Sequence, residues 1–408
     1  MRHSPVFVLF AIIFSLTACK ESTKNNQLSF TIDNPTSVDK IGQTYSVAVK
    51  DVFESTTNVE WTKIGFSDGT NLPFQLIDDN ADGTPETILI ATDLKSKESK
   101  EITINFADEN LNQTFKKRTQ AEISHKTGGT WEDRKYVGGT FENVNSLKVP
   151  QEHTDHSYFI RYEGPGWESD KVGYRFYLDW RNAVDIFGKK TEDMVLQDVG
   201  QDNFDSYHEP ADWGMDILKV GNSLGLGAIG FWSENKATRI EKTSGLQCDI
   251  LQNGVLQSKI RTVYSDWEIN EHTTTLTSEL TIQAGSRLTR QDVFLSNNLP
   301  NICTGIVKHE GTEFLSKTPV NEDSWGYIAT YGKQSLAEDN LGMVVFVRGN
   351  QFVAFQEDEF SHIVVLNPEN GQQVSYYFGA AWEQETDGIK DLEAFKTYLD
   401  NTLELLNN

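Results

Sequence analysis

The chain has 408 residues, a formal net charge of −24, and 11% aromatic and 24% charged residues. This composition excludes a disordered chain, and the length is enough for two domains of ordinary size. The negative charge excludes a general affinity for nucleic acid, because the phosphates would be repelled. A chain of this charge that binds an anionic ligand has to gather positive side chains locally.

The first 18 residues predict a lipoprotein signal peptide. A basic residue near the start precedes an apolar run over 6–16, which is too short to span a bilayer as a mature helix. The sequence LTAC ends at Cys19 and fits the lipobox that bacterial lipoprotein peptidases cleave. We expect a lipid-anchored membrane lipoprotein, in the outer membrane or facing the periplasm, with Cys19 lipidated and 19–26 as a polar tether. The alternative is an ordinary signal peptide with a chance cysteine.

Residues 27–110 predict a small N-terminal β-domain. Short β-prone runs such as TILIATDL and EITINF alternate with turn residues. The turn DDNADG at 78–83 is similar to the start of a calcium loop, but Leu89 stands where an EF-hand loop has its final acid. We therefore predict a polar hairpin turn and no cofactor, with a bound divalent cation as the less favoured alternative.

Polar residues with two glycine pairs predict a connector over 111–150, and β-prone runs return over 151–408. Residues 275–282 alternate apolar and polar side chains at period two, as a half-buried strand does. No alternation of strands with helices is visible, which disfavours Rossmann and TIM architectures. Apolar residues at helical spacing predict one amphipathic helix over 389–403. We therefore predict an all-β fold, a large antiparallel β-sandwich (supersandwich-like) with a small N-terminal β-domain and a C-terminal helix.

Residues 153–232 combine large aromatics, carboxylates and basic side chains within turns. In the expected strand over 174–181, period two places Arg175, Tyr177, Asp179 and Arg181 on one face and apolar side chains on the other. The polar face has the makeup of a floor that binds a carboxylate, and it equally fits a face turned to solvent.

Two turns in this stretch carry candidate ligand contacts. The turn EGPGWESD presents Trp167 beside Glu168, a combination that stacks a sugar ring and binds its hydroxyls, although Trp167 could equally close the sandwich edge. The turn YHEPADWGMD places His208 near Trp213, Asp212 and Asp216, where His208 could act as a general base or hold a metal. A histidine that only bonds its own loop is the more common arrangement, and no metal ligand is predicted.

The runs EGPGWESDKVGYRFYLDWRNAVDIFGKK and YHEPADWGMDILKVGNSLGLG resemble a family of lipoproteins from marine polysaccharide-degrading bacteria, long classed as a domain of unknown function. The resemblance covers nearly all of the mature chain and includes the DDNADG turn. A member of that family is an oligosaccharide dehydratase of ulvan breakdown. The resemblance implies an anionic oligosaccharide as substrate. Water would leave a uronic acid at the non-reducing end, next to sulfated rhamnose, and a 4,5-unsaturated uronyl end would remain.

The chemistry of this elimination assigns hypothetical roles. Arginines must neutralise the charge that builds on the uronate carboxylate, a base takes the C5 proton, and an acid protonates the leaving hydroxyl. Arg175 and Arg181 would bind the carboxylate, His208 would be the base, and Tyr162, Tyr177 or Tyr207 the acid, with Lys189 beside them. Trp167, Glu168 and Trp213 would contact the sugar. Alternatives are a polysaccharide lyase with the same elimination, a non-catalytic glycan-binding lipoprotein, and a glycosidase or epimerase of the sandwich class.

Overall fold

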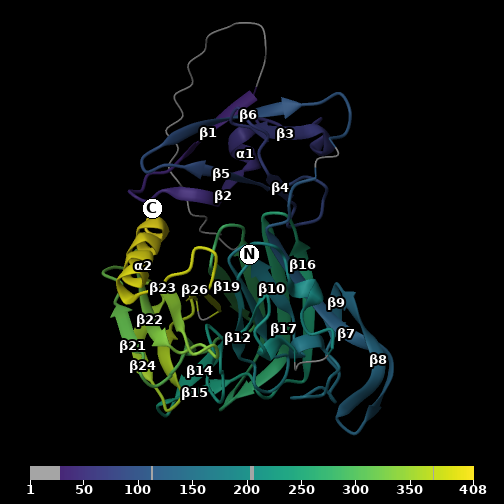
Figure 1. Cartoon of the computed structure of the whole chain (residues 1–408), viewed down its shortest axis with the longest axis vertical. Helices are drawn as coiled ribbons and strands as arrows, with labels where there is room; N and C mark the ends of the chain where they lie inside the picture. The colour runs from purple at the N-terminus through teal and green to yellow at the C-terminus, as the bar shows by residue number, and fades with distance from the viewer. Residues whose placement is uncertain (1–27, 112–113, 203–205, 371) are drawn as a thin grey trace, which may run out of the picture.

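The computed structural model describes residues 28–111, 114–202, 206–370 and 372–408 (Figure 1). The predicted signal peptide, Cys19 and the tether lie outside the described residues. Most of the described chain forms antiparallel strands, with one long helix near the C-terminus, so the predicted all-β sandwich is confirmed. Among the described residues, no helix is long and apolar enough to cross a membrane.

The N-terminal domain consists of two three-stranded antiparallel sheets. Their facing sides bury alternate apolar residues such as Phe66, Ile90 and Ile104. The first sheet, in spatial order, is β1 (Leu28–Asp33), β6 (Ser99–Phe106) and β3 (Ile64–Ser67). The second is β2 (Lys40–Ala48), β5 (Thr87–Leu94) and β4 (Phe74–Ile77), with a single helical turn α1 (Val49–Val52) after β2.

The DDNADG turn joins β4 to β5, which pair as a hairpin. Its carboxylates accept hydrogen bonds from the turn backbone: Asp78 from Gly83 N at 2.8 Å, and Glu86 from Asp79 N at 2.8 Å. These bonds satisfy N–H groups that the tight turn leaves unpaired. The structure thus holds the polar hairpin turn that the sequence predicts. Carboxylate oxygens of Asp78, Asp82 and Glu86 lie within 4.8 Å of one another. These oxygens are the donors that the alternative, a bound divalent cation, would require.

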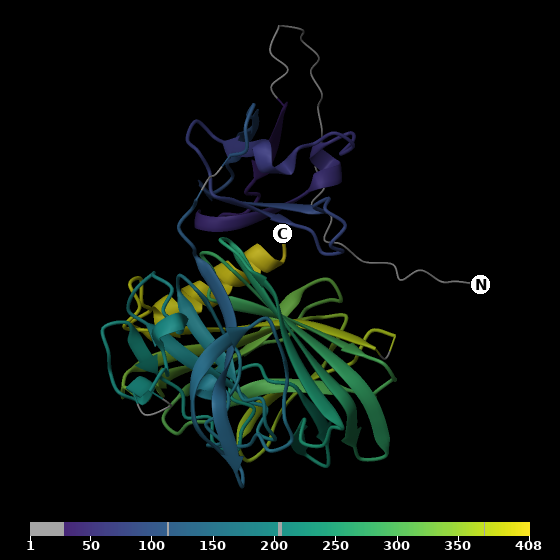
Figure 2. The same cartoon turned by 90° about the vertical axis from the view of Figure 1, so that its right-hand side faces the viewer.

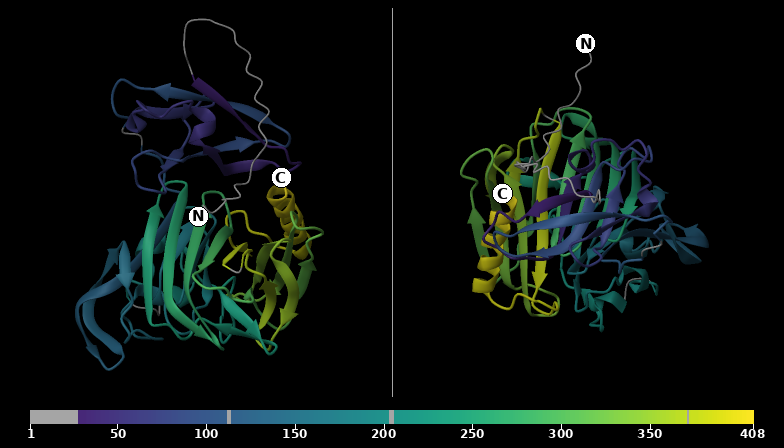
Figure 3. Two further views of the ribbon diagram at one scale, coloured as in Figure 1. Left: turned by 180° about the vertical axis from the view of Figure 1, so that it is seen from behind. Right: turned by 90° about the horizontal axis from the view of Figure 1, so that it is seen from above.

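The large domain is built on a nine-stranded antiparallel sheet, whose long strands lie side by side in Figure 3. In spatial order its strands are β21 (Glu313–Lys317), β22 (Trp325–Lys333), β23 (Asn340–Arg348), β26 (Gln373–Trp382), β19 (Leu288–Leu295), β18 (His272–Gln283), β17 (Gln257–Ile269), β16 (Gly245–Asn253) and β9 (Ser146–Lys148).

Two smaller sheets complete this domain. The six-stranded sheet is β13 (Gly214–Asp216), β12 (Val184–Lys189), β11 (Val172–Phe176), β10 (Gly166–Ser169), β7 (Thr119–Glu132) and β8 (Lys135–Val144). The five-stranded sheet is β15 (Lys236–Arg239), β14 (Gly230–Ser233), β20 (Ile302–Val307), β25 (Ser361–Leu366) and β24 (Phe352–Glu357).

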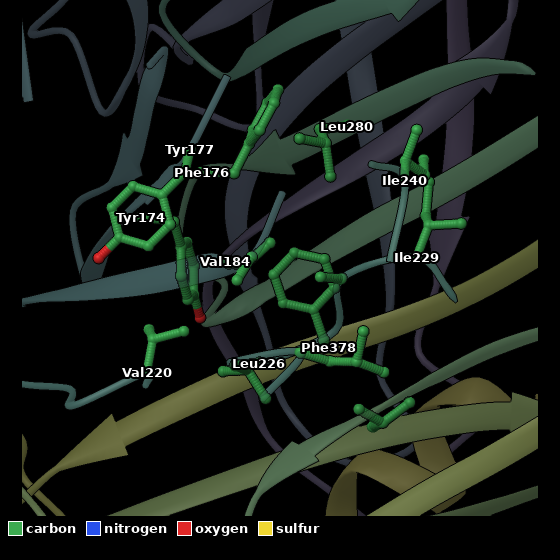
Figure 4. Close-up of a cluster of buried hydrophobic side chains, with 14 of the residues drawn as sticks. Tyr174, Phe176, Tyr177, Val184, Val220, Leu226, Ile229, Ile240, Leu280 and Phe378 are labelled. Atoms are coloured by element: carbon green, nitrogen blue, oxygen red, sulfur yellow. The ribbon is translucent and has the colours of Figure 1, made fainter. Parts of the chain in front are cut away.

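Side chains from these sheets meet in one hydrophobic core. Figure 4 shows Tyr174 and Val184 of the six-stranded sheet together with Leu280 and Phe378 of the nine-stranded sheet. The rings of Tyr174 and Phe378 meet edge to face with centroids 5.6 Å apart. Strands β10, β11 and β12 are buried at every position. These strands of the six-stranded sheet are therefore covered on both faces, and their polar side chains need partners inside the protein.

The prediction of a connector over 111–150 is wrong for most of that segment. Strand β7 pairs with β10, and β9 pairs with β16, so residues from 119 onward belong to the sheets of the large domain. The glycine pairs lie within the β7–β8 hairpin, where Gly129 pairs with Gly138. A side chain at Gly139 would meet the Thr127 carbonyl oxygen at 2.3 Å. These glycines permit close strand pairing, although in the sequence they resemble loop punctuation.

The predicted C-terminal helix is α2 (Leu392–Leu406). Asp391 caps it by accepting a hydrogen bond from Ala394 N at 2.8 Å. Its buried side chains, among them Phe395 and Leu399, pack on β22 and β23. A Cβ atom at Gly342 would lie 2.3 Å from the Phe395 ring, so this glycine lets the helix approach the sheet closely.

The N-terminal domain sits on one end of the large domain, near the C-terminus (Figure 2). Gln75 Oε1 accepts hydrogen bonds from Leu256 N at 2.8 Å and Gln257 N at 2.9 Å. Ile77 and Leu89 of the small domain share an apolar cluster with Leu256. The two domains therefore contact each other through both backbone hydrogen bonds and buried apolar surface.

We predict that Gln75→Ala weakens this contact. The substitution leaves two backbone N–H groups without their acceptor, which costs about 1–3 kcal/mol of unfolding free energy. Urea unfolding and limited proteolysis measure the effect. The exposed Gln151 provides the matched control, and Gln151→Ala should change neither readout. Equal stability of the two variants would contradict the role of Gln75.

Candidate functional site

The predicted strand over 174–181 is shorter in the structure. Strand β11 ends at Phe176, and the chain then turns before β12. Asp179 starts the turn: its backbone oxygen accepts from Asn182 N at 3.1 Å, and its carboxylate accepts from Arg181 N at 2.9 Å. The short side chain of aspartate satisfies the turn backbone, which stops the strand.

The turn nevertheless brings the predicted cationic pair together. The guanidinium carbon of Arg175 lies 5.0 Å from the centre of the Tyr177 ring, and that of Arg181 lies 4.0 Å from the same centre. Glu163 lies between the arginines, 4.0 Å from Arg175 Nη1 and 3.1 Å from Arg181 Nη2. Arg175, Tyr177 and Arg181 therefore lie together, but a turn brings them there and not the predicted alternation along one strand.

Arg175 is the centre of a buried polar network and is 2% exposed. Its Nη2 donates to Asp216 Oδ2 at 2.6 Å and to Asp185 Oδ2 at 2.9 Å. Its Nη1 donates to Tyr207 Oη at 2.9 Å. These internal partners occupy the guanidinium. The hypothesis that Arg175 binds a substrate carboxylate is therefore replaced: Arg175 holds the two aspartates and Tyr207 in place.

Asp185 and Asp216 form a carboxyl pair on this arginine. Both side chains are 1% exposed. Burial, with the nearby charge of Asp185, raises the pKa of Asp216 well above its usual range, and the Arg175 guanidinium only partly opposes this shift. Two buried like charges that face a single cation cannot both ionise, so the pair keeps a proton.

His208 connects this network to solvent. It ends a short 3₁₀ turn (Ser206–His208), and its side chain is 38% exposed. Its Nε2 lies 3.5 Å from Asp216 Oδ2, so Asp216 is the one of the two candidate acids that the structure places beside it. The Tyr207 ring lies against the imidazole, with centroids 4.5 Å apart. A half-exposed imidazole backed by a buried carboxyl group is suited to proton transfer.

The three candidate tyrosines differ in what their hydroxyl groups do. Burial raises the pKa of Tyr162, Tyr177 and Tyr207, so each holds its proton. Tyr162 donates to Glu122 at 2.6 Å, and Tyr177 donates to Asp185 at 2.6 Å. Tyr207 instead accepts from Arg175. Tyr207 is thus the one of the three whose proton is not bonded to a carboxylate.

Arg181 lies nearer the surface, with 14% of its side chain exposed. It contacts Asp179, Glu163 and Asp155, the last at 2.7 Å. Burial acts to raise the pKa of Glu163, but Arg181 and Arg175 outweigh it and lower that pKa to about 2. Glu163 is therefore ionised at neutral pH.

Asp155, His156 and Glu163 place metal-binding atoms within 4.8 Å of one another. Imidazole and carboxylates are suitable donors for a divalent cation. Arg181, however, already contacts both carboxylates and supplies the positive charge that a cation would bring. The donor set is therefore a poor fit to a metal while Arg181 holds this position.

Non-glycine residues with positive φ gather around this cluster. They are His156 (55°), Tyr158 (57°), Tyr162 (39°), Glu163 (68°) and Asn182 (37°). Bulky residues rarely adopt this conformation, and such strain concentrates at functional sites. The local backbone therefore supports placing the functional site here.

Trp167, Glu168 and Lys189 are wrongly predicted as site residues. Trp167 is 1% exposed, and its Nε1 donates to Thr289 Oγ1 at 2.8 Å. Lys189 Nζ donates to Glu168 at 2.6 Å, and both side chains are fully buried. The run GPGWES resembles a turn, but Gly166–Ser169 pairs with β7 and β11 and so lies inside the sheet. Trp213 is half-buried and packs on Phe187, in a cluster with Tyr207.

Asp185 is a site residue that the sequence analysis missed. It stands in the apolar run 184–187, where a carboxylate signals burial with a partner. Arg175 lies directly opposite Asp185 in the register of β11 and β12. Pairing the sequences of β11 and β12 as neighbouring strands could have identified Asp185 as the partner of Arg175.

Residues 32–408 match the family described as "Domain of unknown function (DUF4861)", and the chain belongs to this family. It is similar to "Uncharacterized protein P7" of Formosa agariphila, with 20% identity over 438 residues that cover 100% of this chain and 98% of the relative.

Two solved structures from Enterococcus faecalis, a glycosyl hydrolase family 38 protein and an alpha-mannosidase, match with a TM-score of 0.47 and 9% identity. The matches cover 94% of this chain and 47% and 45% of those chains. The chain therefore spans about half the length of these two structures.

We predict that Trp167→Ala destabilises the fold, because it empties a buried ring position. The expected cost is about 3–5 kcal/mol of unfolding free energy, measured by urea unfolding. Trp180 is 47% exposed and serves as the matched control. Trp180→Ala should cost less than about 1 kcal/mol. If Trp167→Ala is as stable as the control variant, the buried structural role of Trp167 is contradicted.

We also predict strong coupling between Asp185 and Asp216. Either single Asn variant leaves one carboxylate for Arg175 and should cost about 1 kcal/mol or less. The double variant removes both negative charges of the pair beside the buried Arg175 guanidinium. It should lower the free energy of unfolding by about 3–5 kcal/mol. Additive costs in urea unfolding would contradict the shared proton.

The pair also predicts a pH dependence. Because the folded pKa of Asp216 is raised, its contribution to stability is complete below about pH 4 and is lost as the pH rises through the folded pKa. Asp216→Asn removes this loss, so the variant should become more stable relative to the wild type as the pH rises. Parallel stability curves would contradict the raised pKa.

Proposed function

We propose that this DUF4861 protein is a hydro-lyase that dehydrates the non-reducing-end uronic acid of an anionic oligosaccharide. The substrate implied by the family resemblance is glucuronate or iduronate next to sulfated rhamnose in ulvan oligosaccharides. The observation that carries the proposal is the contact network from Arg175 through Asp216 to the half-exposed His208. The predicted anchor at Cys19 would hold the enzyme at a membrane, in the outer membrane or facing the periplasm.

The reaction breaks the C5–H and C4–O bonds of the uronate, forms the C4–C5 double bond and releases water. A base must take the C5 proton while negative charge spreads onto the carboxylate, and an acid must protonate the departing hydroxyl. Without a positive group near the carboxylate, this charge would be too high in energy.

His208 is the base in this proposal. Its side chain is the most exposed of the network, and its Nε2 lies 3.5 Å from Asp216 Oδ2. A carboxyl group beside an imidazole restricts the orientations that the ring can take. Arg175 holds Asp216 in place by donating to its Oδ2 at 2.6 Å.

Tyr207 is the acid that the geometry favours. Its raised pKa keeps it protonated, and its ring lies against His208. When Tyr207 gives up its proton, the tyrosinate oxygen remains 2.9 Å from the Arg175 guanidinium, which stabilises the new charge. Arg181, at the edge of the network, is the candidate partner of the substrate carboxylate.

Mass spectrometry after incubation with uronate-ended oligosaccharides tests the reaction. A dehydratase product keeps its chain length and loses the mass of one water. Shorter chains would indicate the alternative of a lyase, and unchanged substrates would favour a non-catalytic glycan-binding lipoprotein.

We predict that His208→Ala lowers turnover by about 100-fold or more, because general-base catalysis contributes this much. The absorbance of the unsaturated uronyl product measures the rate. His272 on β18 is also partly exposed and provides the matched control. Turnover by His208→Ala equal to that of His272→Ala would remove His208 from the role of base.

A further inference from the structure

The turn between β11 and β12 presents an exposed tryptophan. Of the nine tryptophans in the chain, all of them described, Trp180 is the one that is mostly at the surface, with 47% exposure. Both sides of the turn are held: Arg181 bonds Asp179, and Asn182 Nδ2 donates to Tyr264 Oη at 2.8 Å. The fixed turn thus keeps part of the ring in contact with water.

Arg239, at the end of β15, lies against this ring. Its guanidinium carbon is 5.4 Å from the centre of the Trp180 ring, and the residue is 8% exposed. Its Nη1 donates to the Ser223 backbone oxygen at 3.2 Å. Within the described ranges, Arg239 makes no ion pair, and its other guanidinium nitrogens are not buried.

This unpaired arginine differs from the other buried arginines of the domain. Arg161 is paired with Glu122, and Arg175 is paired with its two aspartates. The protein has a net charge of −24, yet no carboxylate of the described residues forms an ion pair with Arg239. Burial lowers the pKa of Arg239, while Glu241 and Asp179 partly oppose this. A nearly buried guanidinium that still reaches the surface is positioned for an anion from outside.

The pair lies at the edge of the candidate site. Trp180 immediately precedes Arg181, whose guanidinium contacts Glu163 and Asp155. Arg239 lies against Trp180, and Arg181, the next residue in the chain, donates to Asp179 at 2.5 Å. A ligand on Trp180 would therefore lie beside the Arg181 edge of the network.

We propose that Trp180 and Arg239 form a binding subsite for an anionic sugar unit. The C–H face of the sugar ring stacks on Trp180, and its carboxylate or sulfate ester pairs with the guanidinium of Arg239. Both interactions use what the described residues leave available: the exposed part of the Trp180 ring and a cation without an ion pair. The proposed function enters at one point only: it identifies the sugar next to the bound unit as the uronate that undergoes elimination.

Calorimetric binding of defined disaccharides tests the subsite. The probes are a glucuronate-containing disaccharide, its uncharged methyl ester and a monosulfated neutral disaccharide. Comparison of the three affinities shows whether the subsite recognises a carboxylate or a sulfate group. Arg239→Gln should weaken binding of a recognised acidic probe by about 10-fold and leave the methyl ester unchanged. Trp180→Ala should weaken all probes by about 10-fold, whereas Trp180→Phe should keep most of the affinity.

Two surface residues away from the pair serve as matched controls. Phe314 on β21 is 41% exposed, and Arg261 on β17 is paired with Glu279. Phe314→Ala and Arg261→Gln should bind as the wild type does. Thermal unfolding verifies that each variant is folded, and Arg239→Lys, which retains the charge, should recover part of the acidic-probe affinity.

The outcomes separate this inference from the proposed function. Affinities of Trp180→Ala and Arg239→Gln within about twofold of the wild type would overturn the subsite, even if water is eliminated. Weakened binding without any loss of water from a substrate would support the subsite and overturn the dehydratase. A wild-type protein that binds none of the three probes would overturn the subsite as well.

Discussion

The ion cluster of Arg175 with Asp185 and Asp216 is the constraint on which the candidate site depends. Charges taken out of water are stable only when their partners are close and well oriented. The fold meets this need with three neighbouring strands: Arg175 comes from β11, Asp185 lies opposite it on β12, and Asp216 comes from β13. Because both faces of this sheet are covered, the strands cannot shift without leaving a charge unpaired. The cluster thereby fixes the position of His208.

The same requirement governs how an acidic protein can receive an anionic ligand. Positive side chains are indeed gathered in the central stretch, but most of them neutralise carboxylates of the chain itself. Their number therefore says little about ligand charge. What matters is a cation that reaches the surface without an internal ion pair. Arg181 shares its charge among several carboxylates, and Arg239 has no ion pair in the described part of the chain.

The sequence predicted the fold class and the C-terminal helix well, because period-two and helical spacings follow directly from which faces are buried. It also predicted that Arg175, Tyr177 and Arg181 come together. It failed where local composition and tertiary burial disagree. Glycine and proline before Trp167 suggested a turn, but that segment is a central strand. A polar strand face normally indicates solvent, whereas here a second layer covers it and makes Arg175 internal.

The partner of a buried charge cannot be identified from one strand alone. Asp185 follows Arg175 by ten residues, but only the register of β11 and β12 sets the two opposite each other. Asp216 joins from a third strand after a long excursion of the chain. Local patterns therefore located the region of the site, and long-range pairing decided the role of each residue within it.

The contact between the small domain and the final helix has a consequence for the order of folding. Ser37 Oγ donates to Glu404 at 2.6 Å, across 367 residues of sequence. The small domain can form its own sheets early, since all their strands end by Phe106. Its contact with the large domain, however, involves the turn at 254–257 and the last helix. Docking must therefore await the end of synthesis, and the first domain to emerge is the last to be fixed in place.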